Sequence, residues 1–496
     1  MIRLFIVTLL LNLSWAQQTL AADPSIERLM LLHELKQEQS KHDVNTSIIS
    51  PKSTQKPWRV LIDVRSNHSD GTHDFQTLIG LAKQRHIDAL TFTEHDRFTI
   101  RLGLEPIPAW VGYSQEHPSL YVTGLDTFFK NLHRAKQKAD ITIMAGTEST
   151  PSYYWQGIPF KNLSLHGAEK HFITLGIQQP EHIQGLTSYN LTHAYGNKAL
   201  SLVFWFVFIF VLIWVLMRRR KRGVALLLAG SFIAFLSTWL IKPAINADQA
   251  FMQSAAEQGL FTIWTHPGTL SGVREGPMGV QLSTPPYNKH IFAYPADAFA
   301  AVYGDTDANT TPFGLWDRHL MDYMKGYIAK PMWGVSAGDY HEEGQANEYL
   351  GNFPMDVWAK SNTEADILAA LRQGRMTAWH MHKQHNLSVH TLSLTSFDPI
   401  NNQPVQLFTG DEAAIIADIQ LNIGIEERGQ NSNLTSLSGQ WIVNGRIHEK
   451  VVVPISSSQV VVSNLHLSQG QYVIRFQIPA QQGIRLETNP FLVQVR

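Results

Sequence analysis

The stretch RVLIDVRSNHSDGTHDFQTLIGLAKQRHIDALTFTEH, residues 59–95, decides the fold class of this chain. A short apolar strand pattern at 59–64 precedes helical spacing of apolar residues at 74–86, and a second strand pattern follows at 87–95. Strands that alternate with helices in this way are typical of α/β proteins. The second strand ends in two polar residues, Glu94 and His95. We therefore expect an α/β fold with functional side chains where its strands end.

The same alternation continues along the chain and brings further polar residues to strand ends. Strands are expected at 140–148, 171–177, 260–268, 298–304 and 331–341, and helices at 125–139, 248–259 and 363–375. Glu148, His266, Asp339 and His341 all fall near the ends of these strands. Taken singly, each has an ordinary explanation, such as a helix cap or a turn former. Their shared placement favours a site, because the carboxyl ends of the strands carry the chemistry in α/β barrels.

The C-terminal part of the chain, residues 387–496, has a different pattern. Short stretches of alternating polar and apolar residues are separated by Gly, Asn and Ser, for example at 387–397, 415–425 and 471–479. No helical pattern interrupts them. We expect a β-sandwich here, and its sequence contains no catalytic constellation.

Composition and charge exclude several classes of function. The 496 residues include 40 basic and 41 acidic side chains, a balance that argues against a nucleic-acid partner. The chain has no cysteine, so it has no disulfide partner and no thiolate ligand or nucleophile. A transition-metal site must therefore be built from His, Asp and Glu, and the chain has 22 histidines.

Residues 1–22 have the layout of a secretory signal peptide, with Arg3 before an apolar run and small residues at Ala16, Ala21 and Ala22. The sequence does not choose between these alanines as the cleavage point, and an uncleaved anchor is the alternative. Residues 23–57 follow as a polar segment, with a helix expected at its start and then a linker.

Two apolar runs at 199–217 and 224–241 flank the sequence RRRKR at 218–222. Each run is about long enough to cross a bilayer as a helix. Two helices of a protein core are the alternative, but they would not normally be joined by five cations that are costly to desolvate. The positive-inside tendency places the turn in the cytoplasm. We therefore expect a transmembrane hairpin at 199–241 that anchors the protein in membrane lipid at the cell membrane, with 23–198 and 243–496 on the extracytoplasmic (periplasmic) side.

Six segments give the candidate residues a family resemblance. They are SDGTHDFQTLIGLAKQRHIDALTFTEHD (69–96), AGTES (145–149), KHFITLGI (170–177), AAEQGLFTIWTHPG (255–268), LWDRHL with WGVSAGDYH (315–320 and 333–341) and LAALRQGRMTAW (368–379). In this order and spacing the chain resembles the polymerase and histidinol phosphatase (PHP) superfamily of metal-dependent hydrolases, most closely the extracytoplasmic branch that includes carbaryl-hydrolase-like enzymes. The resemblance covers roughly residues 58–385, apart from the hairpin.

The resemblance implies a fold and a set of ligands. The fold is α/β, with a distorted (β/α)7 PHP barrel at 58–198 and 243–386 that the transmembrane hairpin interrupts and the β-sandwich at 387–496 follows. Two or three divalent metal ions are expected, Zn, Mn or Fe. One metal site would use Glu148, His171 and His266. A second would use His95 and His341, with Asp70 as a weaker candidate and Glu94 nearby.

The third metal site departs from the family pattern. The family has an H-x-H motif there, and an ungapped alignment from SDG puts Asp63 and Arg65 at the two histidine positions. Asp63 can still bind a metal ion together with Glu148 and Asp339, but the guanidinium of Arg65 stays protonated and has no acceptor atom. It would either compete with a metal ion or hold an anionic oxygen of the substrate. We therefore predict catalytic roles for Arg65 and Asp339.

These features predict a membrane-anchored extracytoplasmic hydrolase of small-molecule phosphate esters, or of related carbamate or carboxyl esters, that acts through metal-activated water. Two alternatives stay open. One is a catalytically weak PHP-like binding or sensing domain with an altered metal site, and the other is an envelope-assembly factor whose hairpin binds a membrane partner. The hydrolase is favoured because a decaying site would lose ligands at random, whereas Glu148, His171, His266, Asp339 and His341 all remain.

Overall fold

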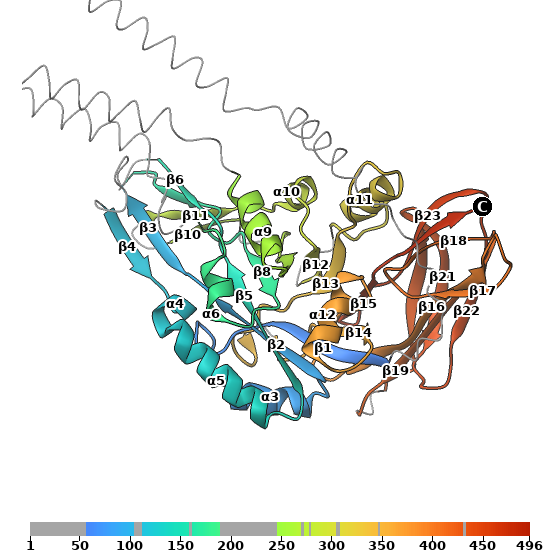
Figure 1. Ribbon diagram of the computed structural model, residues 1–496, viewed down its shortest axis with the longest axis horizontal. Coiled ribbons are helices and arrows are strands. Elements are labelled where there is room, and N and C mark those ends of the chain that lie inside the picture. The colour runs from blue at the N-terminus through green and yellow to red at the C-terminus, as the bar shows by residue number, and fades with distance from the viewer. Residues whose placement is uncertain are drawn as a thin grey trace, which may run out of the picture.

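The computed structural model describes residues 56–103, 112–157, 161–188, 246–268, 272–276, 279–303, 308–345, 348–429 and 433–496. Its main sheet has 15 strands and continues from an N-terminal ring of strands into the C-terminal domain (Figure 1). In order across the sheet, the N-terminal strands are β13 (Trp333–Ser336), β12 (Ala298–Val302), β9 (Phe261–Trp264), β8 (Phe172–Leu175), β5 (Thr142–Ser149), β2 (Ala89–His95), β1 (Lys56–Val64), β14 (Met355–Ala359) and β15 (Met376–His380).

The strand directions bring the ends of β1, β2 and β5 to one place. These three strands are parallel, β9, β12 and β13 are also parallel, and β8 lies antiparallel to both β5 and β9. Beyond the end of β13, Tyr340 forms a parallel bridge with Val64 at the end of β1. Its amide donates to the Asp63 carbonyl (3.0 Å), and the Arg65 amide donates to the Tyr340 carbonyl (2.9 Å). This bridge brings the two ends of the strand series together beside the candidate site.

The sequence explains where several of the helices begin and which of their faces are buried. On α3 (Phe75–Gln84) the buried residues recur at helical spacing, and Asp74 caps the helix by accepting from the Thr77 amide (2.9 Å). Asn246 and Thr363 cap two further helices in the same way. The other described helices are α4 (Leu120–Thr123), α5 (Leu125–Lys138), α6 (Pro180–Gln184), α9 (Ala247–Glu257), α10 (Asn288–Ala293), α11 (Leu315–Met324) and α12 (Glu364–Arg372).

Two small sheets extend from the loops that follow the ring strands. One is a hairpin of β3 (Thr99–Gly103) and β4 (Gly112–Glu116). The other has the order β10 (Gly272–Glu275), β11 (Gln281–Thr284), β7 (Ser164–His166) and β6 (Tyr154–Gln156). Because β7 precedes His171 and β10 follows His266, the second sheet belongs to the same end of the ring as these two histidines.

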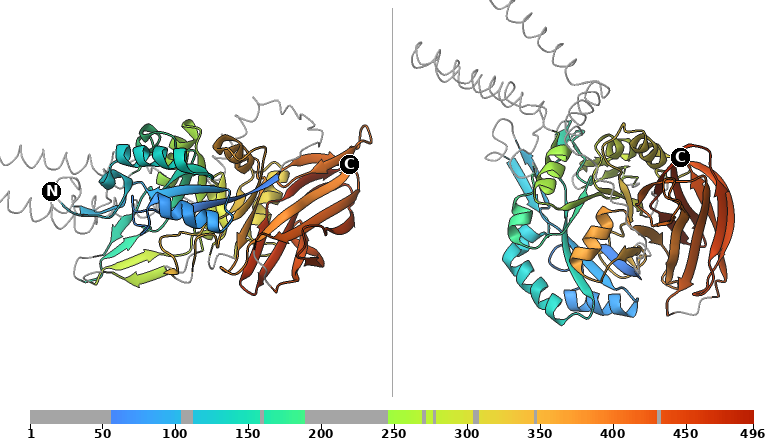
Figure 2. Two further views of the ribbon diagram at one scale, coloured as in Figure 1. Left: turned by 90° about the horizontal axis from the view of Figure 1, so that it is seen from below. Right: turned by 45° about the vertical axis from the view of Figure 1, so that its right-hand side comes forward.

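The C-terminal domain encloses a second hydrophobic core, around Trp441 and Phe476. Figure 2 shows its strands, orange to red, packed as layers beside the ring. One sheet consists of β17 (Pro404–Leu407), β16 (Leu387–Phe397), β19 (Asp418–Glu427) and β22 (Val461–His466). The other is the end of the 15-stranded sheet, with β24 (Ile484–Thr488), β23 (Gly470–Gln481), β20 (Ser436–Val443), β21 (Arg446–Pro454), β25 (Phe491–Val495) and β18 (Glu412–Ile415).

Buried polar contacts join this domain to the ring. β24 pairs with β15, so the two parts share backbone hydrogen bonds. The fully buried Arg475 donates to both carboxylate oxygens of Asp317 (2.6 and 3.0 Å) and to Glu487 (2.9 Å). The amide side chain of Asn489 accepts from the Gly334 amide (2.8 Å) and donates to the Gly334 carbonyl (2.9 Å). It therefore pairs with β13 as a neighbouring strand would.

The expected fold class, α/β with a distorted (β/α)7 barrel interrupted by a transmembrane hairpin, is wrong for the described chain. The chain is mostly β-structure. Only short strands lie between β5 and β8 in the described segments, so β8 runs antiparallel rather than following a helical crossover. The sheet also does not end at the ring, because β14 and β15 carry it onward.

The predicted membrane anchor is contradicted as well. Within the described ranges, every helix is too short or too polar to cross a bilayer. The segments on which the prediction rested, the hairpin at 199–241 and the signal peptide at 1–22, lie outside the described residues, as does the helix expected after residue 23. The predicted location at the cell membrane, facing the extracytoplasmic side, rested on that anchor and is contradicted with it.

Candidate metal centre

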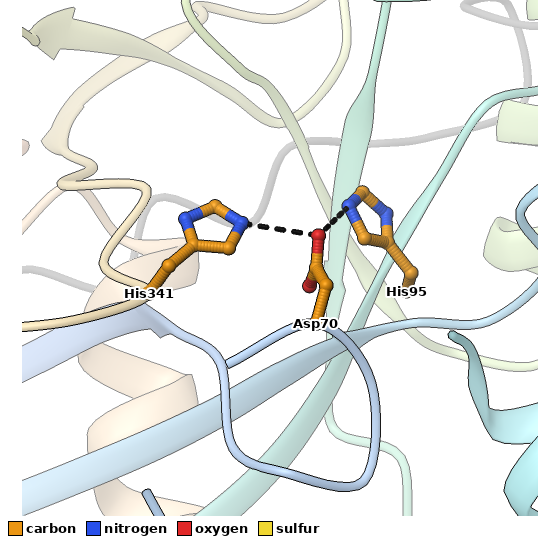
Figure 3. Close-up of side chains that lie close together, drawn as sticks. All are labelled: Asp70, His95 and His341. Atoms are coloured by element: carbon orange, nitrogen blue, oxygen red, sulfur yellow. Dashed lines mark hydrogen bonds and ion pairs between the residues drawn. The ribbon is translucent and has the colours of Figure 1, made fainter. Parts of the chain in front are cut away.

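The first group of candidate ligands is Asp70, His95 and His341 (Figure 3). Asp70 lies in the loop after β1, His95 is the last residue of β2, and His341 follows β13. One carboxylate oxygen of Asp70, Oδ2, lies 3.4 Å from His95 Nε2 and 3.2 Å from His341 Nε2, and Figure 3 shows it between the two rings. Their potential ligand atoms all lie within 4.8 Å of one another, which suits one divalent cation.

The electrostatics of this group hold the carboxylate ionised. Burial opposes ionisation of Asp70, but hydrogen bonds from His341 and His95 outweigh it and lower its pKa. For His341, burial is outweighed by the Asp70 hydrogen bond and by the charge of Asp339, which raise its pKa to about 9. The Nδ1 atom of His341 lies 2.7 Å from the Asp339 carbonyl oxygen and so donates to it. This contact leaves Nε2 as the ring nitrogen that faces Asp70.

The second group is Glu148, His171 and His266, all three almost completely buried. Glu148 lies near the end of β5, His171 precedes β8, and His266 follows β9. The Glu148 Oε1 atom lies 3.1 Å from His171 Nδ1 and 3.3 Å from His266 Nε2. On its other side, Glu148 Oε2 lies 3.6 Å from His95 Nδ1, which connects this group with the first.

Two observations indicate that these residues fit a bound cation. The buried Nδ1 atom of His171 lacks a hydrogen bond of good geometry, although it lies close to Glu148. The opposite ring nitrogen, Nε2, donates to the Ala168 carbonyl (3.1 Å), so Nδ1 is the ring nitrogen that faces Glu148. Burial opposes ionisation of Glu148, but Arg65 and His171 hold its pKa well below the usual range. Burial lowers the pKa of His171, but the charge of Glu148 outweighs burial and raises this pKa. A metal ion bound here would take the place of the His171 proton, because imidazole binds metal ions in its neutral form.

The third group is Asp63, Glu148 and Asp339, and the Arg65 guanidinium lies among them. Arg65 Nη1 lies 3.0 Å from Asp63 Oδ1 and also donates to Thr93, at 2.5 Å to its carbonyl and 2.8 Å to its hydroxyl. Arg65 Nη2 donates to Glu148 Oε2 and, at 3.2 Å, to Asp339 Oδ1. Burial lowers the pKa of Arg65, but Glu148, Asp63 and Asp339 outweigh it and raise the pKa above its ordinary value. A metal ion does not fit this group while Arg65 is there.

Glu94, also predicted as a ligand, lies outside all three groups. Its buried carboxylate accepts from the Ser66 amide (3.0 Å) and from the hydroxyls of Ser66 and Ser69 (2.5 Å each). Burial raises its pKa to about 7 against the lowering effect of these hydrogen bonds. Glu94 therefore supports the loop that carries Asp70.

The backbone near the candidate ligands is unusual at three positions. Asp63, His266 and Asp339 have positive φ angles of 69°, 28° and 47°. Residues other than glycine rarely adopt such angles, because the angles are strained. Strained residues persist only where the surrounding packing holds them, and they are concentrated at functional sites. At Asp63 the pairing of β1 with β2 also shifts register between Leu61 and Val64. The strain coincides with residues that the sequence predicted to be functional.

Some residues that support the centre were not predicted from the sequence. Thr93 accepts hydrogen bonds from Arg65 through its carbonyl and its hydroxyl. It lies two residues before His95 on β2, and side chains two residues apart on a strand point to the same face, so the sequence could have indicated Thr93. The Thr265 hydroxyl lies 3.4 Å from Glu148 Oε1. The buried Tyr287 donates to the Thr265 carbonyl (2.5 Å), and its sequence context gives no indication of this role.

A cavity of about 730 Å³ is connected with the second group only through neighbouring residues, because Glu148, His171 and His266 do not line it. Its wall includes Lys170, which precedes His171 in the chain, and Tyr287, which contacts the residue before His266. Lys170 donates to Asp248 (2.6 Å), and His290 Nε2 lies 2.7 Å from the same carboxylate oxygen. The lining also includes the exposed Lys289 and a tyrosine stacked on a histidine, Tyr154 on His166. A cavity lined by two lysines suits an anionic ligand.

Comparison with known proteins gives a weak likeness. No protein-family model matches the chain, and no curated protein matches it. Among solved structures, a two-domain protein from Bacteroides vulgatus that contains a predicted PHP-like metal-dependent phosphoesterase is 12% identical, with 92% of this chain and 100% of that chain covered and a TM-score of 0.34.

Two further solved structures have similar scores. A proposed metal-dependent phosphoesterase from Bifidobacterium adolescentis is 12% identical, covers 59% of this chain and 90% of its own, and has a TM-score of 0.28. An amidohydrolase from Chromobacterium violaceum, with bound sulfate and no metal, is 14% identical, covers 58% and 88%, and has a TM-score of 0.26. Two of these descriptions name a metal-dependent phosphoesterase and one names an amidohydrolase. Scores this low assign neither an activity nor the carbaryl-hydrolase-like branch to this chain.

Proposed function

We propose that this protein is a PHP-like metal-dependent hydrolase with two divalent metal ions. The observation that carries the proposal is the meeting of two ligand groups, Asp70–His95–His341 and Glu148–His171–His266, at one end of the strand ring. His95 and Glu148 belong to different groups and lie 3.6 Å apart, so the two ions would be neighbours. Zn²⁺, Mn²⁺ and Fe²⁺ all suit ligands of this kind, and such ions supply Lewis acidity and an activated water.

The substrate class that fits best is a small phosphate ester, with carbamate or carboxyl esters as related candidates. The argument is the cavity whose wall contains Lys170 and Lys289, because ammonium groups attract the negative charge of a phosphate, although Asp248 offsets part of the Lys170 charge. Asp248 contacts both Lys170 and His290, so it fixes the ammonium group at the cavity wall. A neutral ester would gain less from this arrangement.

Asp339 is the residue we assign to proton transfer. Its side chain is 29% exposed, whereas Asp63 and Glu148, the other carboxylates of the third group, are 0% and 1% exposed. A substrate can therefore reach Asp339 more readily than the other two. Arg65 donates through both terminal nitrogens to protein acceptors, so its role is to hold these carboxylates rather than to contact the substrate.

The presence of Arg65 also favours one alternative function, a catalytically weak PHP-like domain for binding or sensing. A direct assay separates the two. The full chain is stripped of metal by a chelator, reloaded with Zn²⁺, Mn²⁺ or Fe²⁺, and assayed on aryl phosphate monoesters, aryl phosphate diesters and aryl carbamates. We expect hydrolysis of a phosphate ester that the chelator abolishes and reloading restores.

Asp339→Asn should lower kcat by about 100-fold or more, as loss of a general acid or base does. Asp418→Asn is the matched control, because Asp418 is an exposed carboxylate paired with a histidine far along the chain. Metal binding without hydrolysis of any of these esters would favour the binding or sensing alternative.

A further inference from the structure

The bridging carboxylate Glu148 has two different environments at its two oxygens. Oε1 faces the imidazoles of His171 and His266. Oε2 accepts a hydrogen bond from the Arg65 guanidinium. A carboxylate that bridges two metal ions presents one oxygen to each ion. Here one side of that bridge is a ligand set for a metal, and the other side already has a cation of the protein itself.

The position of Arg65 matches that of an ion in the third group. The guanidinium contacts one oxygen from each of the three carboxylates, Asp63, Glu148 and Asp339. One oxygen of each of these carboxylates lies within 4.8 Å of the others, a spacing that a metal ion also needs. Planar guanidinium N–H groups and a metal ion compete for the same carboxylate lone pairs.

The surroundings hold Arg65 in this position. Its side chain is fully buried, and the Thr93 carbonyl and hydroxyl bind Nη1 on the side away from Glu148. Its backbone amide is fixed by the Tyr340 carbonyl. Asp63 is fixed as well, because its second oxygen accepts from the Asp339 amide (2.7 Å). Displacing Arg65 would leave three buried or partly buried carboxylates uncompensated, and it would also remove hydrogen bonds from Thr93.

We propose that Arg65 is a permanent substitute for the third metal ion, so that the chain binds two ions and a guanidinium where its site would otherwise hold three ions. The inference rests on the proposed metal centre, and it assigns Glu148 the role of bridging a metal ion and an arginine. Arg65 is accordingly a positioning residue: it orients Glu148 and Asp339 without contacting the substrate.

Metal counting tests this proposal without reference to activity. Metal-free full-length protein is equilibrated with excess Zn²⁺, and in a second series with Mn²⁺, then dialysed, and the bound metal is measured by elemental analysis. The wild type should bind two equivalents. Arg65→His should bind three, because it replaces the guanidinium with a ligand nitrogen. Arg65→Met is the matched comparison: it removes the competing guanidinium without supplying a ligand, so a third ion held by the three carboxylates alone should bind more weakly than in Arg65→His and be lost first on dialysis.

Three equivalents in the wild type, or fewer than two, would overturn the proposal. A folded Arg65→His protein that binds only two would do the same. If Arg65→His does not fold, anomalous diffraction from zinc-soaked wild-type crystals decides the question. Two zinc peaks with Arg65 between Asp63 and Glu148 are expected, and a third peak with Arg65 displaced contradicts the proposal. Two bound ions without hydrolysis would remove the proposed function but leave this inference intact.

Discussion

Gly71 lies so close to the end of β1 that a β-carbon at position 71 would be 2.5 Å from the Arg65 carbonyl oxygen. A backbone atom cannot move aside as a flexible side chain can, so Gly71→Ala should push the loop that carries Asp70 away from β1. We expect the protein to lose the metal equivalent held by Asp70, His95 and His341 and to keep the other. Elemental analysis after dialysis measures this.

Gly80→Ala is the matched control for that change. Gly80 lies on α3 with open space where its β-carbon would be, so the metal content should stay at the wild-type value. The substitution should stabilise the helix by about 0.5–1 kcal/mol, because alanine is the better helix former. A Gly71→Ala protein with both equivalents would show that the loop tolerates the added carbon.

His266→Ala and His341→Ala should each remove one metal equivalent, and a different one. His266 belongs to the Glu148 group and His341 to the Asp70 group. Loss of a direct ligand should weaken metal affinity by more than the roughly 10–100-fold that outer contacts cost. Isothermal titration with Zn²⁺ should show one remaining tight site in each variant. The exposed His466 gives the control, and equal loss of both sites in either variant would argue against two separate groups.

Lys170→Met should raise KM for a phosphate ester by about tenfold while changing kcat little, because a charged hydrogen bond contributes about 1.5–3 kcal/mol. The reason is that Lys170 lies in the wall of the cavity that we propose for the phosphate. Lys330→Met is the control, since Lys330 also pairs with an aspartate, Asp297, but lines a different cavity. Steady-state kinetics over a range of substrate concentrations separates the two constants. An unchanged KM would place the phosphate elsewhere.

Glu94 should make the metal-free protein less stable as the pH rises. Its pKa is raised from the ordinary value of 4.5 to about 7 in the folded state, so the folded protein binds this proton more tightly than the unfolded chain does. The stability that the bound proton gives is complete below about pH 4.5 and is lost as the pH rises through about 7. Thermal unfolding midpoints at pH 5 to 8 should therefore fall less steeply in Glu94→Gln than in the wild type. The exposed Glu116→Gln should follow the wild-type slope, and a parallel slope in Glu94→Gln would contradict the prediction.

Arg475→Met should destabilise the protein by about 3–5 kcal/mol, because it leaves the buried carboxylates of Asp317 and Glu487 without their partner. Arg428→Met should cost only about 0–1 kcal/mol, since Arg428 is 18% exposed and its contacts with Asp88 and Glu426 are 3.3 and 3.8 Å long. Urea unfolding followed by tryptophan fluorescence measures both. Similar losses in the two variants would mean that Arg475 does not hold the domains together.

Much of the candidate centre could be predicted from the sequence because strand ends gather at one edge of a sheet. Glu148, His266 and His341 were each placed after an apolar strand pattern, and the structure brings them into the same region. Glu94 shows the limit of this reasoning. It is adjacent to His95 on a fully buried strand, and neighbouring side chains on a strand point to opposite faces. Only one of the two could face the metal groups.

Other features depend on contacts between distant parts of the chain, which local patterns do not encode. The pairing of β24 with β15 joins segments about a hundred residues apart, and nothing in either strand indicates its partner. The contact of Arg65 with Thr93 is of the same kind. The fold class was wrong partly for this reason: alternating helices and strands predicted parallel crossovers, whereas β8 returns through short strands alone in the described segments.

The strand pair β15–β24 and the amide of Asn489 have a practical consequence for anyone who wishes to study the ring of strands alone. A fragment that stops at residue 386 would expose the backbone N–H and C=O groups of Thr377 to His380 and so make β15 an unpaired edge strand. Other chains can pair with such an edge strand, which leads to aggregation. It would also uncover the amide and carbonyl of Gly334, which Asn489 now satisfies. The C-terminal domain thus protects the edge strand of the proposed metal-binding half from pairing with other chains.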